Sequence, residues 1–221
     1  MDQNVILVET VPLEFDLESL GCRLRIRPGQ TKFMDRLSRL AEEAVRVARP
    51  KAVARLCGLT ILDEEKVQVG EVIFSSPLLR QKMDGLGRPF PIWREGMELA
   101  DWSLSLSSSL EQVFASALRE VAVQQAEKLL ERTLLERYGI AQVSAMNPGS
   151  LKVWSLEEQV PLFELLAPLP EKLGVTLLPS LMMRPEYSVS GVFFQTDSKF
   201  YNCQLCPKKE CPNRKVPSLV T

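Results

Sequence analysis

Residues 104–139 read LSLSSSLEQVFASALREVAVQQAEKLLERTLLERYG, the longest stretch of helical periodicity in the chain. One apolar stripe consists of Leu106, Leu110, Val113, Ala117, Leu118, Val121, Leu129, Leu130 and Leu134. This spacing predicts a helix over Leu104–Tyr138, and Gly139 is placed for a left-handed C-terminal cap. The spacing is uneven and rich in Ser and Ala, which favours a core helix packed on a sheet over a coiled-coil seam.

Composition places the chain among ordinary globular proteins. It has 221 residues, with 45% hydrophobic and 25% charged residues, which suits one domain with at most a small appendage. A net charge of −1 argues against a nucleic-acid binder that works by phosphate neutralisation. No apolar run approaches the roughly 20 residues that a membrane helix needs. The start, MDQNVILVETVPLEFD, is acidic where a signal peptide is basic, so we expect a cytoplasmic protein.

The chain contains no histidine, and this excludes whole classes of catalytic site. Neither a Ser–His nor a Cys–His nucleophile pair can form, and no zinc can be held by imidazole. Any chemistry must come from carboxylates, Lys, Tyr, Cys, a cofactor or a partner. The five cysteines are an odd number, which favours reduced thiols or metal ligands over a disulfide framework.

Helical and strand-like patterns are mixed along the chain. The patterns predict strands over residues 4–10, 22–29, 52–61, 66–74, 174–182, 187–194 and 198–203. Further helices are predicted over residues 31–47, 77–83 and 155–166, with a loop over 84–91. The pair Gly85-x-Gly87 in this loop lacks the setting of a dinucleotide fingerprint and is interpreted as a turn. Because strict βαβ alternation is missing, the fold class is predicted to be α+β with a largely antiparallel sheet.

Four segments in the second half of the chain form one ordered set. They are NPGS (147–150), LEEQVPLFELL (156–166), GVTLLPSLMMRPEYSVSG (174–191) and DSKFYN (197–202). With these segments, the region from Val143 to Tyr201 resembles the core of the activation domain of cobalamin-dependent methionine synthase. The resemblance implies a mainly antiparallel twisted sheet flanked by helices, in a free-standing domain over residues 1–202. A cysteine-containing tail, residues 203–221, would follow it.

The resemblance also implies a function in corrinoid chemistry. In that family, cob(I)alamin occasionally oxidises to inactive cob(II)alamin, and the activation domain supports its reductive methylation with S-adenosylmethionine. The implied partner is a corrinoid-binding protein or a methionine synthase catalytic subunit, which carries the cobalamin, with a flavodoxin or ferredoxin as electron donor. This work needs positioning more than acid–base catalysis, so a chain without histidine can perform it.

The resemblance assigns an S-adenosylmethionine site to particular residues. The implied residues are Met146, Asn147, Pro148, Gly149, Glu158, Lys199, Phe200 and Tyr201. The family loop carries an arginine for the ligand carboxylate and a tyrosine in the pocket, and the alignment puts Ala145 and Ser150 at these positions. An alanine methyl group cannot pair with a carboxylate. Either another cation replaces the arginine, with Arg184 as a candidate, or S-adenosylmethionine is not the ligand.

Three cysteines, Cys203, Cys206 and Cys211, lie close together after the aromatic segment. Thiolates at this spacing can hold an iron–sulfur cluster or zinc, with Cys22, Cys57, a partner or solvent as the fourth ligand. Four basic residues surround them and favour thiolates: Lys208, Lys209, Arg214 and Lys215. The alternative is a surface loop of free thiols. We expect an accessory metal or redox site beside the methyl-transfer pocket.

Three hypotheses of function therefore stand. The first is an accessory or reactivation protein for a corrinoid methyltransferase that uses S-adenosylmethionine. The second is a non-catalytic module that binds a corrinoid protein or transfers electrons through a cysteine-ligated metal, without S-adenosylmethionine. The third is an oligomerisation role of the long helix.

Overall fold

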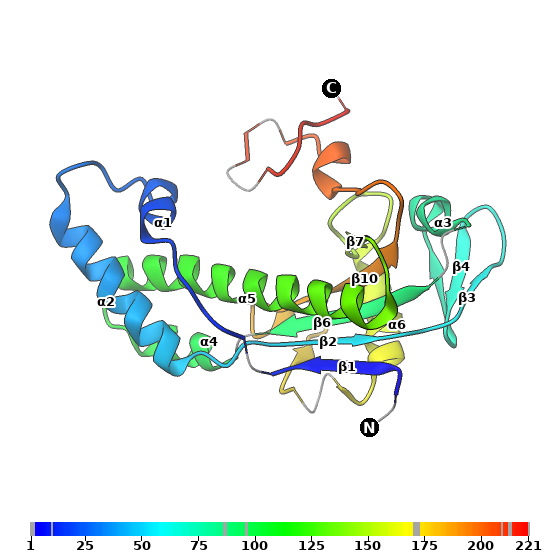
Figure 1. Ribbon diagram of the computed structural model, residues 1–221, viewed down its shortest axis with the longest axis horizontal. Coiled ribbons are helices and arrows are strands. Elements are labelled where there is room, and N and C mark those ends of the chain that lie inside the picture. Colours follow the sequence, from blue (N-terminus) through cyan, green and yellow to red (C-terminus); the bar gives the residue numbers. More distant parts are fainter. Residues whose placement is uncertain are drawn as a thin grey trace.

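The computed structural model describes residues 3–9, 11–85, 88–95, 97–169, 173–208, 210–211 and 214–220. Its centre is a five-stranded sheet in the order β1-β2-β6-β10-β7, and every neighbouring pair is antiparallel. The strands are β1 (Val5–Val8), β2 (Lys51–Arg55), β6 (Pro89–Glu95), β7 (Val143–Met146) and β10 (Val189–Gln195). Helices flank this sheet (Figure 1), which confirms the predicted α+β class.

Among the described residues, two smaller sheets and six α-helices accompany the central sheet. The smaller sheets are β3 (Leu59–Ile61), β4 (Lys66–Val69) and β5 (Val72–Ser75), and the pair β8 (Thr176–Leu177) and β9 (Met183–Arg184). The helices are α1 (Leu17–Arg23), α2 (Thr31–Val47), α3 (Pro77–Met83), α4 (Met97–Ser105), α5 (Ser109–Tyr138) and α6 (Gln159–Leu166). Two 3₁₀ turns are η1 (Leu156–Glu158) and η2 (Asn202–Leu205). In the described residues, no helix is both long and apolar enough to cross a membrane.

Helix α5 spans the molecule and joins two separate parts of the core (Figure 1). Its first half packs with α2 and α4 through Phe114, Leu118 and Ala122. Its second half lies on the sheet, where Leu130 and Leu134 contact residues of β1, β2 and β6. Gly139 ends the helix with φ of 63° and ψ of 36°, as predicted. The core-helix interpretation is confirmed.

The start and the stripe of this helix differ from the prediction. Helix α4 ends at Ser105, and α5 begins separately at Ser109. Leu110 and Val113 are 39% and 55% exposed, while Glu111 and Phe114 are buried in this part of the helix. The buried face is therefore rotated from the predicted stripe in the first turns, because α2 covers only one side of this end.

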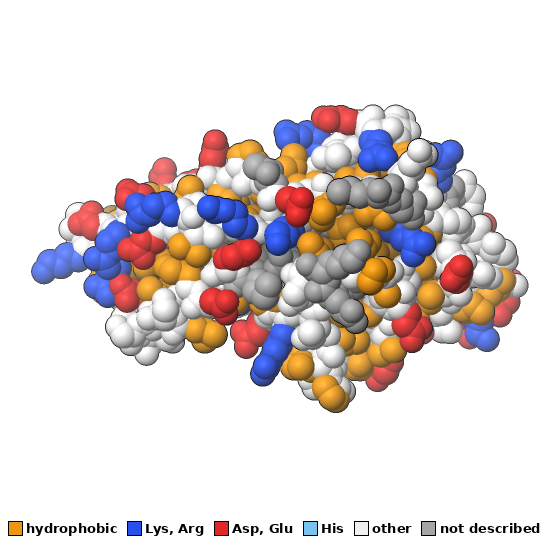
Figure 2. Space-filling model, turned by 90° about the horizontal axis from the view of Figure 1, so that it is seen from below, with side chains coloured by type: hydrophobic (Ala, Val, Ile, Leu, Met, Phe, Trp, Pro, Cys, Tyr) orange, Lys and Arg blue, Asp and Glu red, His pale blue; other side chains and the backbone are white. Residues whose placement is uncertain are grey.

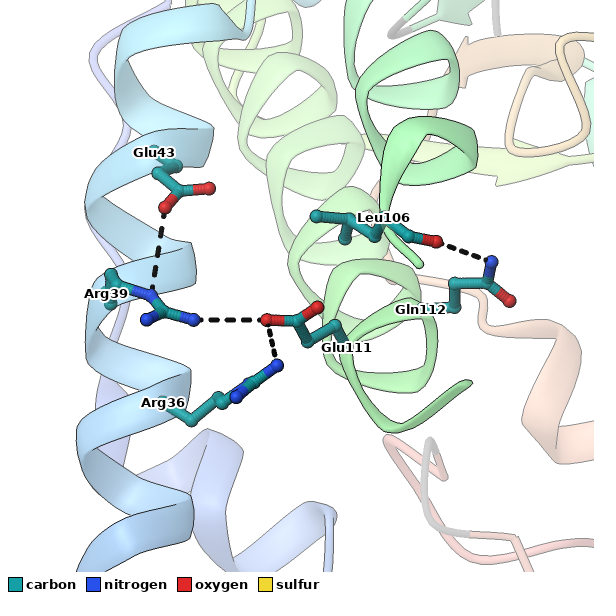
Figure 3. A network of polar contacts seen from close by, with 6 residues as sticks. All are labelled: Arg36, Arg39, Glu43, Leu106, Glu111 and Gln112. Carbon is teal, nitrogen blue, oxygen red and sulfur yellow. Dashed lines mark hydrogen bonds and ion pairs between the residues drawn. The ribbon is translucent and has the colours of Figure 1, made fainter. Parts of the chain in front are cut away.

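A charged cluster fixes the first turn of α5 against α2 (Figure 3). Glu111 is only 7% exposed, and its carboxylate lies 2.5 Å from Arg36 and 3.1 Å from Arg39. Arg39 also approaches Glu43 at 3.8 Å. A negative charge near the N-terminus of a helix interacts favourably with the helix dipole, so Glu111 also stabilises the first turn of α5. The side chain of Gln112 donates to the carbonyl of Leu106 at 2.9 Å, which ties α5 to the turn after α4.

The opposite face of the sheet has its own core. Trp93 of β6 and Val192 and Phe194 of β10 point away from α5. They pack with Leu162 of α6 and with Phe74 of β5. The central strands β6 and β10 are thus buried on both faces, which explains their near-continuous apolar sequence.

The predicted strand over residues 22–29 is wrong. This stretch contains the end of α1, whose N-cap Asp16 accepts a hydrogen bond from the amide of Ser19 at 3.0 Å. The chain then turns at Arg25, which has a φ of 57°. Leu24 and Ile26 alternate with charged residues as in a strand, but they lie in a turn and pack against the hydrophobic cluster that contains the buried residues of α2.

Other strand boundaries also need correction. Residues 52–61 form β2 and β3 in different sheets, and residues 66–74 form the hairpin of β4 and β5 around Gly70, which has a φ of 61°. Only Thr176–Leu177 of the predicted strand over 174–182 is a strand. Helix α2 and helix α3 have the predicted positions, and Ser76 accepts a hydrogen bond from Leu79 at 3.2 Å as the α3 cap.

The predicted loop over residues 84–91 is shorter than expected, because Pro89 and Pro91 belong to the central strand β6. Proline is normally excluded from such strands because it has no amide to donate. Here the pairing of β6 with β2 ends at Ala54–Ile92 and does not include the two prolines. No hydrogen-bond donor is therefore missing from the pairing with β2. Gly87 of the predicted Gly85-x-Gly87 turn lies outside the described residues.

Candidate functional site

A cavity of about 530 Å³ lies between α5, the strands β7 and β10, and the segment 199–203. We call it the α5–β7 pocket. Its charged lining residues are Arg94, Glu127, Lys128, Glu131, Lys199 and Lys215. The other lining residues are Gln124, Val143, Ala145, Asn147, Phe193, Phe200, Tyr201, Asn202 and Cys203. Five residues of the predicted sites, Asn147, Lys199, Phe200, Tyr201 and Cys203, therefore lie around one cavity.

Asn147 forms one wall of the pocket because β10 has a glycine beside it. Its side-chain amide donates to the carbonyl of Ser190 at 2.7 Å. A Cβ atom at Gly191 would lie 2.4 Å from Nδ2 of Asn147 and 2.5 Å from the carbonyl of Met146. The glycine of the SVSG segment is thus required for the close contact between β7 and β10.

The predicted residues next to Asn147 pack in the core or form a turn, and they do not line the pocket. Met146 points to the opposite core. Pro148 and Gly149 form the predicted turn, closed by the amide of Ser150 donating to the carbonyl of Asn147 at 3.2 Å. Gly149 has a φ of 76°, and a Cβ atom there would lie 2.7 Å from the side chain of Leu156, so glycine fits this third place of a type II turn. This turn supports the pocket wall but does not line the pocket.

The segment 199–201 closes the pocket as irregular backbone, so the predicted strand over 198–203 is wrong. The amide of Phe200 donates to Oγ of the buried Ser144 at 2.7 Å, which anchors the segment to β7. The amide of Tyr201 donates to the side chain of Gln204 at 3.1 Å, and η2 follows directly. The aromatic residues are therefore held by side-chain acceptors, which strand periodicity does not reveal.

Two ion pairs border the pocket. Arg94 pairs with Glu127, and Lys199 pairs with Glu131. Burial lowers the pKa of Arg94, while the adjacent Glu127 raises it. Nε of Arg94 is buried and has no hydrogen-bond partner among the described residues. The pocket thus holds four basic and two acidic side chains, with unused donor capacity on a buried arginine.

Glu158 and Arg184 do not reach the pocket. Glu158 precedes α6 and accepts a hydrogen bond from the amide of Ser75 at 3.3 Å. Burial raises its pKa, against the opposing effect of the Ser75 amide and of Trp154. Arg184 lies on β9 and lines a different cavity. Arg94, not Arg184, is the arginine that shares the pocket with Ala145.

The sequence did contain signals for the residues that were missed. Gln124, Glu127, Lys128 and Glu131 follow helical spacing and form one polar stripe on α5, beside the apolar stripe of Leu130 and Leu134. Arg94 alternates with Phe90 and Ile92 on the α5 face of β6. An arginine that continues the buried face of a strand marks a polar cavity.

Of the three C-terminal cysteines, Cys203 lines the pocket and is held by residues 214 and 215. Sγ of Cys203 accepts from the amide of Lys215 at 3.5 Å, and the carbonyl of Cys203 accepts from Arg214 at 3.2 Å. All five cysteines lie in the described residues and none of them is in a disulfide, and Cys22 is exposed on α1. Within the described ranges, no group of three or more Cys, Asp or Glu side chains is arranged to hold a metal ion. Lys209 lies outside those ranges.

The comparisons with known proteins place the fold. No protein-family model matches the chain, and no curated protein matches it either. Among solved structures, 13 chains match. One of them is a crystal structure of the MetH reactivation domain bound to AdoHcy, with 17% sequence identity and a TM-score of 0.61. The match covers 89% of this chain and 80% of that one, so this protein has the fold of a MetH reactivation domain.

Proposed function

We propose that the chain binds S-adenosylmethionine in the α5–β7 pocket and acts as an accessory or reactivation protein for a corrinoid methyltransferase such as methionine synthase. One observation supports this most: over 89% of its length the chain shares the fold of a domain solved with AdoHcy. The pocket that gathers Asn147, Lys199, Phe200 and Tyr201 adds to this argument.

The charges of the pocket match the charges of this ligand. S-adenosylmethionine carries a carboxylate, an ammonium and a sulfonium. The guanidinium of Arg94, which lines the pocket, can donate to the carboxylate that the family loop arginine would otherwise bind. Glu127 or Glu131 can accept from the ammonium, and the ring of Tyr201 offers a face for the cationic sulfonium or for adenine. The replacement of arginine by Ala145 is therefore compatible with binding.

The proposed work of the chain is to position the ligand. S-adenosylmethionine would supply the methyl group, while cobalamin would belong to the partner, a corrinoid-binding protein or a methionine synthase catalytic subunit. A flavodoxin or ferredoxin would supply the electron, in the cytoplasm. The residues of this chain would hold the sulfonium end towards the docked partner and limit access of water.

A calorimetric titration of the full chain with S-adenosylmethionine tests this proposal. We expect saturable binding, at least about tenfold weaker in Lys199→Met and Tyr201→Ala, because both changes remove contacts inside the pocket. Lys32→Met is the matched control, since Lys32 is exposed on α2, away from the pocket. No binding at about 1 mM ligand, a concentration that reveals even weak sites, would contradict the proposal.

The same titration decides on the second hypothesis, a corrinoid-binding or electron-transfer module without S-adenosylmethionine. Ala145 favours this hypothesis, because it lines the pocket at the aligned position of the arginine and carries no charge. Capture of a corrinoid protein by a chain that ignores S-adenosylmethionine would select it.

For the cysteines we retain the proposal of an accessory metal site at Cys203, Cys206 and Cys211. Its support is the short spacing of the three thiols and the nearby cations Lys208 and Arg214. Protein purified without oxygen is expected to contain stoichiometric iron or zinc, which is lost in the triple serine variant. Metal-free protein from metal-replete cells would contradict a metal site and leave free thiols.

A further inference from the structure

A second cavity, of about 420 Å³, lies between α4, the middle of α5 and the segment 184–186. It shares no lining residue with the α5–β7 pocket. We call it the Arg119 cavity. Ala100, Asp101 and Leu104 of α4 form one side, and Arg184, Pro185 and Glu186 form the other.

Arg119 of α5 lines this cavity and is only 7% exposed. Its Nη1 donates to Oγ of Ser103 at 3.0 Å, and its guanidinium lies over the ring of Tyr187, 4.3 Å from the centroid. Nε is buried with no hydrogen-bond partner among the described residues, and these residues form no ion pair with the guanidinium within 4 Å. Glu186, which lines the same cavity, acts on this charge only from farther away. By contrast, the buried Arg94 has Glu127 as its partner.

A buried guanidinium with no carboxylate in direct contact is costly, because burial removes water from a permanent charge. Stacking on Tyr187 compensates only part of this cost. A carboxylate that enters the cavity would pair with the charge and find donors on Arg119 without a partner of their own. Charge-assisted pairs of this kind are among the strongest hydrogen bonds in proteins.

The rest of the lining narrows the class of ligand. Asp101 and Glu186 balance the positive charges of Arg119 and Arg184 in the lining, which suits a zwitterion with an ammonium group better than a phosphate. Leu104 is 77% exposed, an unusual position for a leucine on a helix beside a cavity, and Pro185 lies across from it. A carboxylate, an ammonium and an aliphatic group occur together in a free amino acid.

We propose that the Arg119 cavity binds a free amino acid with an aliphatic side chain. Its carboxylate would contact Arg119, its ammonium would face Asp101 and Glu186, and its side chain would cover Leu104. This site is independent of S-adenosylmethionine binding, and failure of either proposal leaves the other intact.

Three matched small molecules separate the contributions of the groups. L-leucine carries all three groups, 4-methylpentanoate lacks the ammonium, and 3-methylbutylamine lacks the carboxylate. In titrations of the full chain, followed by calorimetry and by the NMR signal of the Arg119 Nε–H, we expect L-leucine to bind best. We expect 4-methylpentanoate to bind more weakly, and 3-methylbutylamine and inorganic phosphate not to bind at about 10 mM, a concentration that reveals even millimolar affinities.

Variants test whether Arg119 is the group that binds. Arg119→Met is expected to weaken L-leucine binding at least about tenfold, whereas Arg132→Met on the exposed side of α5 leaves it unchanged. If Arg119→Met does not fold, Ala100→Phe keeps the arginine and fills the cavity, and it should abolish binding. The proposal is overturned if L-leucine fails to bind, or if phosphate or 3-methylbutylamine binds as tightly as L-leucine. It is also overturned if the Ala100→Phe variant binds L-leucine with unchanged affinity.

Discussion

The two ends of α5 use the same kind of ion pair for different purposes. At the first turn, Glu111 pairs with Arg36 and Arg39 of α2 (Figure 3). Towards the other end, Glu127 and Glu131 pair with Arg94 and Lys199, and both pairs border the α5–β7 pocket. Charges at the α2 end therefore hold two helices together, whereas charges at the pocket end remain available to a ligand.

The surface charges are also consistent with ligand binding in local pockets. On the face shown in Figure 2, basic and acidic side chains are intermixed, most densely towards the end that contains α2. A mixed surface of this kind produces no single-sign field for a polyanion, as the net charge of −1 also indicates. Ligand binding is therefore expected from local pockets.

The largest effect on stability is expected where the backbone shapes the pocket end. Gly191→Ala would place a methyl group 2.5 Å from the carbonyl of Met146 and still closer to Asn147, so β7 and β10 must separate. We expect a loss of about 2–4 kcal/mol in the free energy of unfolding. Urea denaturation measures it. Gly58→Ala is the control, because no atom lies within 4 Å of its Cβ position, and equal losses in both variants would contradict the close contact.

The next effect separates the two ends of α5 directly. Glu111→Gln is expected to cost about 1–2 kcal/mol of unfolding free energy, because it leaves Arg36 and Arg39 with an uncharged partner at a buried site. Glu131→Gln should cost less than about 0.5 kcal/mol, since both Glu131 and Lys199 are partly exposed.

Ligand affinity should show the reverse order in the same two variants. Titration with S-adenosylmethionine is expected to be unchanged in Glu111→Gln and weakened several-fold in Glu131→Gln. A stability loss in Glu131→Gln equal to that in Glu111→Gln would remove the distinction between the two ends.

Much of the fold follows from local sequence signals. The cap at Ser76, the left-handed Gly139 and the turn at Pro148–Gly149 are each set by a few neighbouring residues, and all three lie where predicted. The failures have non-local causes. Residues 22–29 alternate like a strand but are bent by packing against α2, and the prolines of β6 are tolerated only because β2 ends beside them.

Only part of the candidate site could be predicted, because the resemblance assigns residues on particular segments and does not show which other strands lie beside them. Asn147 and Lys199–Tyr201 were assigned by resemblance, and they meet at one cavity. Glu158 was assigned in the same way but lies beside β5. Arg94 was missed because it belongs to a strand far from these segments in sequence, and only the sheet order brings it to β10.

The smallest effect concerns pH and should leave the pocket untouched. Burial raises the pKa of Glu158 in the folded protein above its value in the unfolded chain. Its ionisation therefore disfavours the folded state above the folded pKa, and this penalty disappears when the pH falls below the unfolded value. Glu158→Gln should slightly raise the melting temperature near pH 7 and have no effect at about pH 4. A stabilisation of equal size at both pH values would show that the charge is not the cause.

The most direct test of the account is a crystal structure of the full chain grown with saturating S-adenosylhomocysteine, the ligand named for the MetH domain structure. If S-adenosylmethionine binds in the α5–β7 pocket, ligand density is expected there, bordered by Asn147 and Tyr201, with the carboxylate beside Arg94. An empty pocket at saturation, or the ligand bound elsewhere on the chain, would contradict the account.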